Sequence, residues 1–306
     1  MIQKKYFDYQ KKINPNLFTD YNLITLNISQ KFLLDINKCV VNLFNYSEEK
    51  HFKNIHQVQK FLNKTKFYSL KKNLNLMTKL EKVVYNYLLK IKIINKHIKG
   101  IQFPIDIRIA HPNKPKQLKK KKYLTSTIHC DTWTEEPTDI INGILYLVVN
   151  KNTPKISILQ SDKDDISKYR KYARTYKNKF FLNSKKYFSI VKELGSKKSC
   201  QFKHKNGQLM IFNGFVPHQT IVEGNEVRLS LEFRLRTQNP YKETNKWRNY
   251  NNYGRYWFLP SGNEDDFFQR LKTEYSKIKK LKNFEKIINL RNNEIVKKLI
   301  LKNSKS

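Results

Sequence analysis

The fold class of this chain is decided by residues Glu226–Arg236, which read EVRLSLEFRLR. Apolar residues occupy every second position of this stretch, and arginine, serine and glutamate occupy positions between them. Because successive side chains of a strand point to opposite faces, the alternation predicts a strand with one apolar and one polar face. Charged groups are costly to remove from water, so a polar face of this kind needs a partner if it lines an interior.

Six further runs upstream, rich in branched and aromatic residues, also predict strands. They are Phe103–Ala110, Tyr123–Cys130, Ile140–Asn150, Lys155–Gln160, Gly207–Phe212 and His218–Val222. A polar stretch at residues 161–200 interrupts the series and is expected to be helical in part. Together with the first stretch, these runs predict a mainly β core of roughly seven or eight strands.

Helical patterns flank the β core on both sides. Apolar residues recur with helical spacing from Leu76 to Ile91, and Gly100 is expected to close that helix. Two further helical patterns lie at Asp265–Lys282 and Phe284–Leu301. We therefore expect a single domain over residues 1–306, made of a helical flank at 1–100, the β core with its insert at 101–238, and a helical flank at 239–306.

Composition excludes several classes of protein. Hydrophobic residues make up 39% and aromatic residues 13% of the chain, which excludes wholesale disorder. The longest strongly apolar run, Gly143–Val149, is far shorter than the roughly 20 residues that span a bilayer, and Met1–Lys12 lacks the apolar region of a secretory signal. Three widely spaced cysteines, Cys39, Cys130 and Cys200, argue against a disulfide framework. We expect a soluble, cytoplasmic protein without membrane contact.

The net charge is +36, from 61 Lys+Arg against 25 Asp+Glu. A surplus of this size ordinarily suggests a polyanion such as nucleic acid. Lysine and asparagine are abundant throughout the chain, however, and only Lys119–Lys122 forms a dense basic run. This pattern is typical of a coding sequence poor in G and C. We therefore interpret the lysines as a solvated coat and expect no nucleic-acid partner.

Two histidines and an aspartate provide a candidate metal site. His129 and Asp131 are two positions apart at the end of a predicted strand, so alternation points them to one face and Cys130 away from it. His218 follows 87 residues after Asp131, at the start of another predicted strand. Two imidazoles and a carboxylate are the ligands of the facial triad, which holds Fe(II) and leaves positions open. The alternative is chance, because His-x-Asp is a common tripeptide.

Arg228 and Ser230 provide a candidate anion site. Arg228 follows ten residues after His218, and Ser230 lies two positions further on. A planar guanidinium binds a carboxylate through two hydrogen bonds, and a neighbouring hydroxyl can add a third. The alternative is an exposed strand face with basic residues. For Arg234 and Arg236 that alternative is as good as any function.

The motifs His129-x-Asp131, His218 and Arg228-x-Ser230, in this order, resemble those of the Fe(II)/2-oxoglutarate-dependent dioxygenases. The resemblance implies a double-stranded β-helix (a jelly-roll, cupin-like fold) flanked by N- and C-terminal α-helices. It implies Fe(II) as the metal held by His129, Asp131 and His218. It also implies that Arg228 binds the far carboxylate of 2-oxoglutarate, with Ser230 as its helper. The implied reaction consumes O2 and releases succinate and CO2, with no catalytic side chain beyond the metal centre.

The resemblance covers Phe103–Arg236, and the residues around the metal motif narrow it. Residues 128–133, IHCDTW, are similar to the phytanoyl-CoA-hydroxylase-like branch, especially to bacterial members encoded among carbohydrate or surface-glycan biosynthesis genes. The Gly-Ser-His segment common in that branch is absent. The branch implies a small-molecule or carbohydrate substrate, with Trp133 and Arg108 as candidate contacts. The alternatives are a hydrophobic plug for Trp133 and a surface salt bridge for Arg108.

Two other functions stay open. The spacing Arg228-x-Ser230-x-Glu232-x-Arg234 is similar to a strand of nucleic-acid-dealkylating dioxygenases, although positions 230 and 232 do not match. Glu232 would also repel an acidic cosubstrate if it faced the same pocket. The other function is that of a non-catalytic, cupin-like protein that binds a metal or a sugar.

Overall fold

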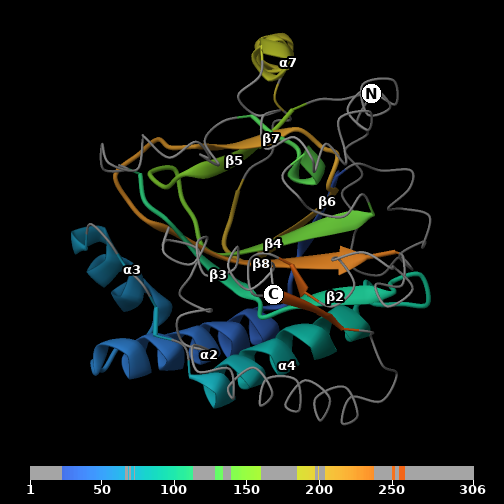
Figure 1. The fold of residues 1–306 in the computed structure, drawn as a ribbon. Coiled ribbons are helices and arrows are strands. Elements are labelled where there is room, and N and C mark those ends of the chain that lie inside the picture. Colours follow the sequence, from blue (N-terminus) through green and yellow to red (C-terminus); the bar gives the residue numbers. More distant parts are fainter. Residues whose placement is uncertain are drawn as a thin grey trace, which may run out of the picture. The chain divides into compact units, whose positions relative to one another are not determined.

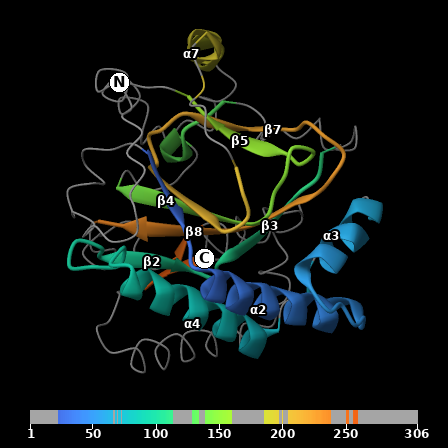
Figure 2. The same ribbon diagram turned by 180° about the vertical axis from the view of Figure 1, so that it is seen from behind.

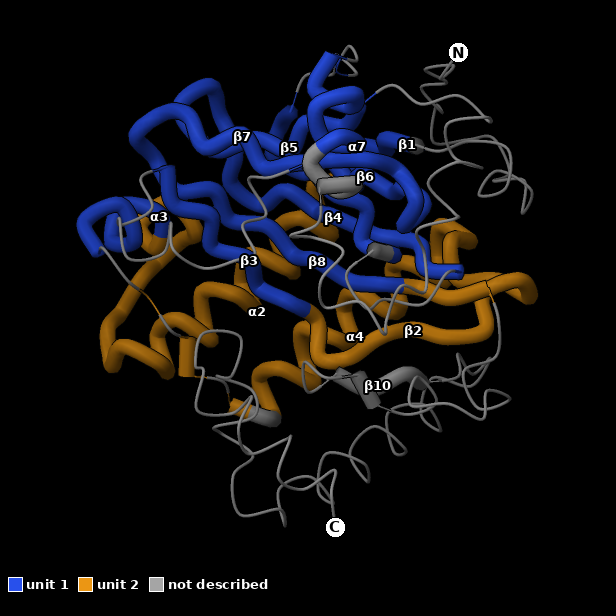
Figure 3. The backbone as a smooth tube through the Cα atoms, turned by 45° about the horizontal axis from the view of Figure 1, so that its top comes forward, with its two compact units in different colours: residues 1–29, 59–66, 106–234 blue, residues 30–58, 67–105, 235–306 orange. Residues whose placement is uncertain are grey.

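The chain, seen in a computed structural model, forms two compact units (Figure 3). Unit 1 comprises residues 1–29, 59–66 and 106–234, and unit 2 comprises residues 30–58, 67–105 and 235–306. The structure describes residues 23–65, 68, 70–71, 73–112, 128–133, 139–159, 185–196, 199, 204–237, 250–251 and 255–258. Within these residues, every helix is too short or too polar to cross a membrane.

Unit 1 contains a larger sheet in which the strand order is β1–β6–β4–β8–β3. The bounds are β1 (Leu23–Asn27), β3 (Asp106–Ala110), β4 (Ile140–Val148), β6 (Gln208–Asn213) and β8 (Arg228–Arg236), whose last two residues belong to unit 2. β6 runs antiparallel to β1 and β4, and β3 runs antiparallel to β8. The strand predicted from the alternation in Glu226–Arg236 is confirmed as β8, with Leu229, Leu231 and Phe233 buried.

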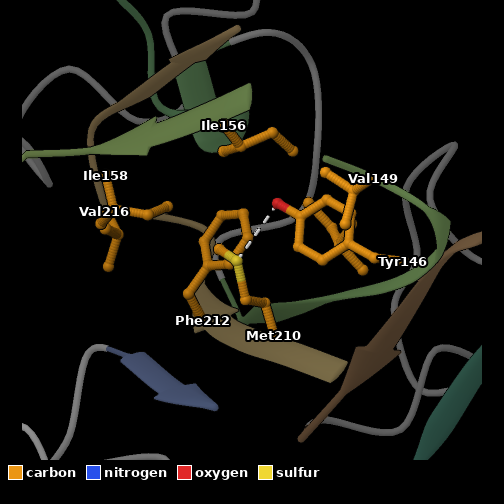
Figure 4. Packing of buried hydrophobic residues seen from close by; sticks show 8 residues of the cluster. Tyr146, Val149, Ile156, Ile158, Met210, Phe212 and Val216 are labelled. Atoms are coloured by element: carbon orange, nitrogen blue, oxygen red, sulfur yellow. Dashed lines mark hydrogen bonds between the residues drawn. The ribbon is translucent and has the colours of Figure 1, made fainter. Parts of the chain in front are cut away.

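A second, two-stranded sheet of unit 1 pairs β5 (Lys155–Ile158) antiparallel with β7 (His218–Ile221). It forms a separate layer opposite β4 and β8, which both ribbon views show (Figures 1 and 2). Buried side chains of β4, β5 and β6 fill the space between the layers (Figure 4), and the cluster comprises Ile144, Tyr146, Val149, Ile156, Ile158, Met210, Phe212 and Val216. Each strand contributes residues two positions apart, because these share one face of a strand.

β4 and β8 approach each other closely at Gly143. A Cβ atom at this position would lie 2.2 Å from Cζ of Phe233. Glycine thus lets the Phe233 ring lie against the backbone of β4. Phe233 belongs to the apolar face of β8, so the polar face of that strand is on the same side of the sheet as the interlayer cluster.

Unit 2 consists of helices and a short antiparallel ladder. Helices α2 (Gln30–Glu48) and α4 (Leu74–Lys90) lie side by side (Figures 1 and 2), and the rings of Phe32 and Tyr87 stack with 3.5 Å between their centroids. The ladder joins the end of β8 to β2 (Gly100–Phe103), then β10 (Arg255–Phe258) and β9 (Tyr250–Asn251). Three elements remain: α3 (Ile55–Lys64), divided between the units, and α7 (Lys185–Gly195) and the 3-10 helix η1 (Asp131–Trp133) of unit 1.

The helix predicted from Leu76 is confirmed as α4, but the prediction that Gly100 closes it is wrong. The helix ends at Lys90, and Lys92 adopts the left-handed conformation with a φ of 58°. Turns and bends fill residues 91–97, and Gly100 opens β2. A glycine beyond an apolar run is typical of a helix end, yet a lysine takes the left-handed position here.

Other predictions differ from the structure in detail. The N-terminal 100 residues were expected to be helical, but they also supply strand β1. The strand predicted at Phe103–Ala110 is divided into β2 and β3 around Pro104, because proline has no N–H to donate to a ladder. The helices predicted at Asp265–Lys282 and Phe284–Leu301 lie outside the described residues. The division at residues 100 and 238 stays a prediction.

Candidate metal centre

The three expected metal ligands come together within unit 1. His129 and His218 form an isolated β-bridge, in which the backbone N–H of each residue donates to the carbonyl oxygen of the other, at 2.9 and 2.8 Å. Asp131 follows in η1. One ligand atom from each of the three side chains lies within 4.8 Å of the other two. Backbone pairing therefore unites residues that are far apart in the sequence.

The side chains of these residues converge on one oxygen. Oδ1 of Asp131 lies 3.6 Å from Nε2 of His129 and 3.7 Å from Nε2 of His218. The two imidazole centroids are 4.4 Å apart. Nδ1 of His218 lies 3.0 Å from the carbonyl oxygen of Val216, which fits a tautomer that donates from Nδ1 and leaves the Nε2 lone pair for a metal.

The electrostatic surroundings keep this ligand set in the form that binds a metal. Burial alone would raise the pKa of Asp131, but Arg234 and the two imidazoles outweigh it and hold that pKa well below its usual range. Burial, followed by the neighbouring His129, lowers the pKa of His218 to about 4. A charged carboxylate and a neutral imidazole at neutral pH are the protonation states that metal binding requires.

Cys130 lies between two of the expected ligands but points away from them, as the alternation predicted. Its thiol donates to the carbonyl oxygen of Phe215 at 3.1 Å. The side chain packs in a second buried cluster, whose other members are Ile128, Leu159, Ile190 and Leu194. Burial raises the pKa of this thiol well above its usual value, so Cys130 is a packing residue.

Arg228 and Ser230 are both buried on the polar face of β8. Arg228 is 1% exposed and Ser230 is 0% exposed. The guanidinium donates from Nη1 to the carbonyl oxygen of Pro154 at 3.4 Å and lies 5.8 Å from the centroid of the Tyr146 ring. Nε of Arg228 and Oγ of Ser230 have no hydrogen-bond partner among the described residues. Burial lowers the pKa of Arg228, and this buried cation has no carboxylate in ion-pair contact within the described part of the chain.

Tyr146 was not recognised from the sequence as part of this region. Its ring lies beneath the Arg228 guanidinium, and its hydroxyl donates only to the thioether of Met210 at 3.3 Å in the contacts shown (Figure 4). A thioether is a weak acceptor, so the hydroxyl is available for a better one. The available signal was a phenol within the otherwise apolar strand at Gly143–Val149.

Arg234 has a different place from the exposed strand face that was one reading of the sequence. Its Nη2 donates to Oδ2 of Asp131 at 3.2 Å, and its Nε donates to Oδ1 of Asn142 at 3.2 Å. Alternation along β8 had put Arg234 on the same face as Arg228, but it could not show which acid would meet it. Arg236 is buried as well, at 1% exposure.

The two residues expected to contact a substrate, Arg108 and Trp133, belong to β3 and η1. Arg108 of β3 lies opposite Ser230 in the register, so the two side chains share a face. Its Nε is 3.8 Å from Oε1 of Glu232, and the two side chains are 26% and 23% exposed. Glu232 therefore has a cation beside it on this face. Trp133 ends η1, and its side chain lies outside the described part.

No family model matches the chain, and no curated protein matches it. The chain is similar to the solved structure of the Kdo hydroxylase KdoO, a non-heme Fe(II) alpha-ketoglutarate dependent dioxygenase, at 10% identity over 76% of this chain and 88% of that chain, with a TM-score of 0.41. It is also similar to SnoK, a non-heme alpha-ketoglutarate dependent carbocyclase from nogalamycin biosynthesis, at 8% identity over 76% and 87%, with a TM-score of 0.40.

A third similar structure is a prolyl-4-hydroxylase from Pseudomonas putida, at 12% identity over 73% of this chain and 92% of that chain, with a TM-score of 0.35. With TM-scores no higher than 0.41, the likenesses carry no functional argument. Within this chain, His129, Asp131 and His218 form a group that can hold a metal ion.

Proposed function

We propose that the protein is an Fe(II)- and 2-oxoglutarate-dependent dioxygenase that hydroxylates a small-molecule or sugar-related substrate. The reaction would convert substrate C–H, 2-oxoglutarate and O2 to substrate C–OH, succinate and CO2. The observation that carries the proposal is a compact His129, Asp131 and His218 group together with Arg228 on the same side of the sheet. Arg228 is buried and has no carboxylate partner among the described residues. The facing sheets of unit 1 support a double-stranded β-helix for this core.

The donor set of the metal group suits Fe(II). Two neutral imidazoles and one carboxylate are the ligand types of non-heme iron sites that keep positions open for exchangeable ligands. When bound, the metal and 2-oxoglutarate together supply the oxygen chemistry. The chain supplies the ligand geometry, a carboxylate that stays charged and a histidine that stays neutral at neutral pH.

The unsatisfied donors on β8 fit a dicarboxylate. A buried cation with one long contact to a carbonyl oxygen is costly, and an unmade hydrogen bond to a buried donor adds to the cost. A carboxylate placed between Arg228 and Ser230 would satisfy Nε of the one and Oγ of the other. We assign these two residues to the far carboxylate of 2-oxoglutarate, with the Tyr146 hydroxyl as a further donor.

The substrate side is proposed on fewer contacts. Arg108 and Glu232 place a positive and a negative charge, both partly exposed, on the face that carries Ser230. A polar substrate such as a sugar or another small molecule would find hydrogen-bonding groups there. We keep Arg108 and Trp133 as substrate contacts, and the phytanoyl-CoA-hydroxylase-like branch and a cytoplasmic location as parts of this proposal.

Succinate release tests the proposed function. Purified full-length protein is incubated under air with Fe(II), ascorbate and 2-oxoglutarate, and succinate is measured with and without candidate substrates. We expect slow substrate-independent turnover in the wild type and none in His129→Ala or Asp131→Ala. Equal succinate from the wild type and both variants would contradict the proposal. Metal binding without any turnover would support a non-catalytic, cupin-like protein in its place.

A further inference from the structure

The two carboxylate oxygens of Asp131 have different partners. Oδ1 faces the imidazoles, 3.6 Å from Nε2 of His129 and 3.7 Å from Nε2 of His218. Oδ2 accepts a hydrogen bond from Nη2 of Arg234 at 3.2 Å. The carboxylate is thus oriented so that Oδ1 is the oxygen presented to the point on which the imidazole nitrogens converge.

Arg234 is itself held from a second side. Its Nε donates to Oδ1 of Asn142 at 3.2 Å, and Asn142 is only 4% exposed. Asn142 belongs to β4, the neighbour of β8 in the larger sheet. A guanidinium is planar and rigid, so contacts at two of its nitrogens fix the orientation of its plane. Two adjacent strands therefore determine where the guanidinium presents Nη2.

We propose that Arg234 is a positioning residue that holds Asp131 as a one-oxygen metal ligand, and that Asn142 holds Arg234 in the orientation needed. The inference rests on the proposed function, since it requires a metal at His129, Asp131 and His218. A carboxylate that bound through both oxygens would take one more coordination position from the exchangeable ligands. With Oδ2 engaged by Arg234, that position stays open.

The chain offers contrasts that separate orientation from charge. Arg234→Lys keeps a cation but loses the planar fork, so it cannot hold Asp131 and Asn142 in the same way. Asn142→Ala keeps Arg234 and removes the hydrogen bond that its Nε donates to Asn142. Lys205→Met removes a cation at an exposed position of unit 1 and serves as the control for net charge.

Co²⁺ binding tests the inference without requiring turnover. Metal-free full-length protein is titrated with Co²⁺ by calorimetry, and the visible absorption of bound Co²⁺ reports its coordination. We expect Arg234→Met to bind Co²⁺ about 10–100-fold more weakly than the wild type, the usual cost of losing an outer-shell partner. Its Co²⁺ spectrum should change as Oδ2 becomes free to bind. Arg234→Lys should change the spectrum too, Asn142→Ala should weaken binding less, and Lys205→Met should match the wild type.

A general loss of stability would lower occupancy without changing the spectrum, so the spectrum separates positioning from a merely structural role. The inference would be overturned if Arg234→Met and Asn142→Ala both gave the wild-type Co²⁺ spectrum and bound Co²⁺ with an affinity within about twofold of the wild type. If circular dichroism shows that Arg234→Met does not fold, Arg234→Lys and Asn142→Ala decide on the same criteria. A wild type that binds no Co²⁺ would overturn the metal site itself, and with it both proposals.

Discussion

Arg234 and Arg228 stand on the same face of β8, yet the two regions around them differ in what they lack. Arg234 meets a carboxylate of the metal group at 3.2 Å and an amide oxygen at 3.2 Å. Arg228 is more deeply buried, and within the described residues it contacts one carbonyl oxygen at 3.4 Å and the face of Tyr146 at 5.8 Å. One guanidinium has its anion within the chain, whereas the other has none among the described residues.

This difference indicates that the two arginines of β8 have different roles, one at the metal group and one at a ligand. A paired cation stabilises the group it contacts, so the region of Arg234 is complete without a ligand apart from the metal. A buried cation without a counterion is costly to the fold, and such groups are retained where a ligand supplies the missing charge.

The largest effect is expected on the affinity for 2-oxoglutarate, the anion that we assign to Arg228. Arg228→Ala should weaken 2-oxoglutarate binding by about 2–4 kcal/mol, because a desolvated, charge-assisted hydrogen-bond partner of the carboxylate is lost. Calorimetric titration of the Co²⁺-loaded protein measures this, and Co²⁺ affinity should stay unchanged. Unaltered 2-oxoglutarate affinity would move the anchor to another residue.

The metal end should respond to pH through His218. The pKa of its imidazole is about 4 in the folded protein because of burial, against 6.5 ordinarily. Between about pH 6.5 and 4, His218 is therefore protonated in the unfolded state and neutral in the folded state. Stability of the metal-free protein should fall as pH drops from about 6.5 to 4, by something like 3 kcal/mol from this group. Urea unfolding across that window measures it, with His218→Gln as the variant whose slope should be shallower. Equal slopes would contradict this assignment.

The two arginines should differ in their effect on the ligand-free fold. Arg234→Met leaves the Oδ2 atom of Asp131 without its donor and should lower the free energy of unfolding by about 1–3 kcal/mol. Arg228→Met removes a poorly satisfied buried cation and should leave that free energy unchanged or higher. Denaturant midpoints at neutral pH compare them. A larger loss for Arg228→Met would mean that the fold itself needs that cation.

The smallest effect is expected at Cys130, which lies between two ligands in sequence but faces the apolar cluster. Cys130→Ala should cost about 1 kcal/mol of stability from lost packing. Co²⁺ affinity should equal that of the wild type. A marked loss of affinity would place the thiol, or the backbone it holds, in the metal site.

The sequence allowed β8 and the candidate ligands to be predicted, but only β8 and the His129-x-Asp131 pair follow from short-range patterns. Alternation predicted β8. His218, 87 residues after Asp131, was chosen because it supplies the second imidazole of a facial triad, and the structure brings the three residues together. Partners that belong to different strands could not be predicted. Arg234 meets Asn142, and Arg228 meets Tyr146, because β4 and β8 become neighbours. Arg234 also meets Asp131, which lies outside both strands in η1.

Local sequence patterns also did not indicate strand β1 or the residue at which α4 ends. Strand β1 pairs with β6, more than 180 residues later, and its five residues carry little signal without that partner. The end of α4 depends on a left-handed lysine, which no residue preference indicates.

Titration of 2-oxoglutarate into the wild type, with and without Co²⁺ and in the absence of O2, tests whether one ligand spans the metal group and Arg228. If one ligand joins the metal group to Arg228, affinity should fall sharply when the metal is omitted, and it should fall again in Arg228→Ala with the metal present. Succinate has two carboxylates but no 2-oxo group with which to chelate a metal, so its affinity should gain much less from Co²⁺ than that of 2-oxoglutarate. An affinity for 2-oxoglutarate that is the same with and without Co²⁺ would contradict the account.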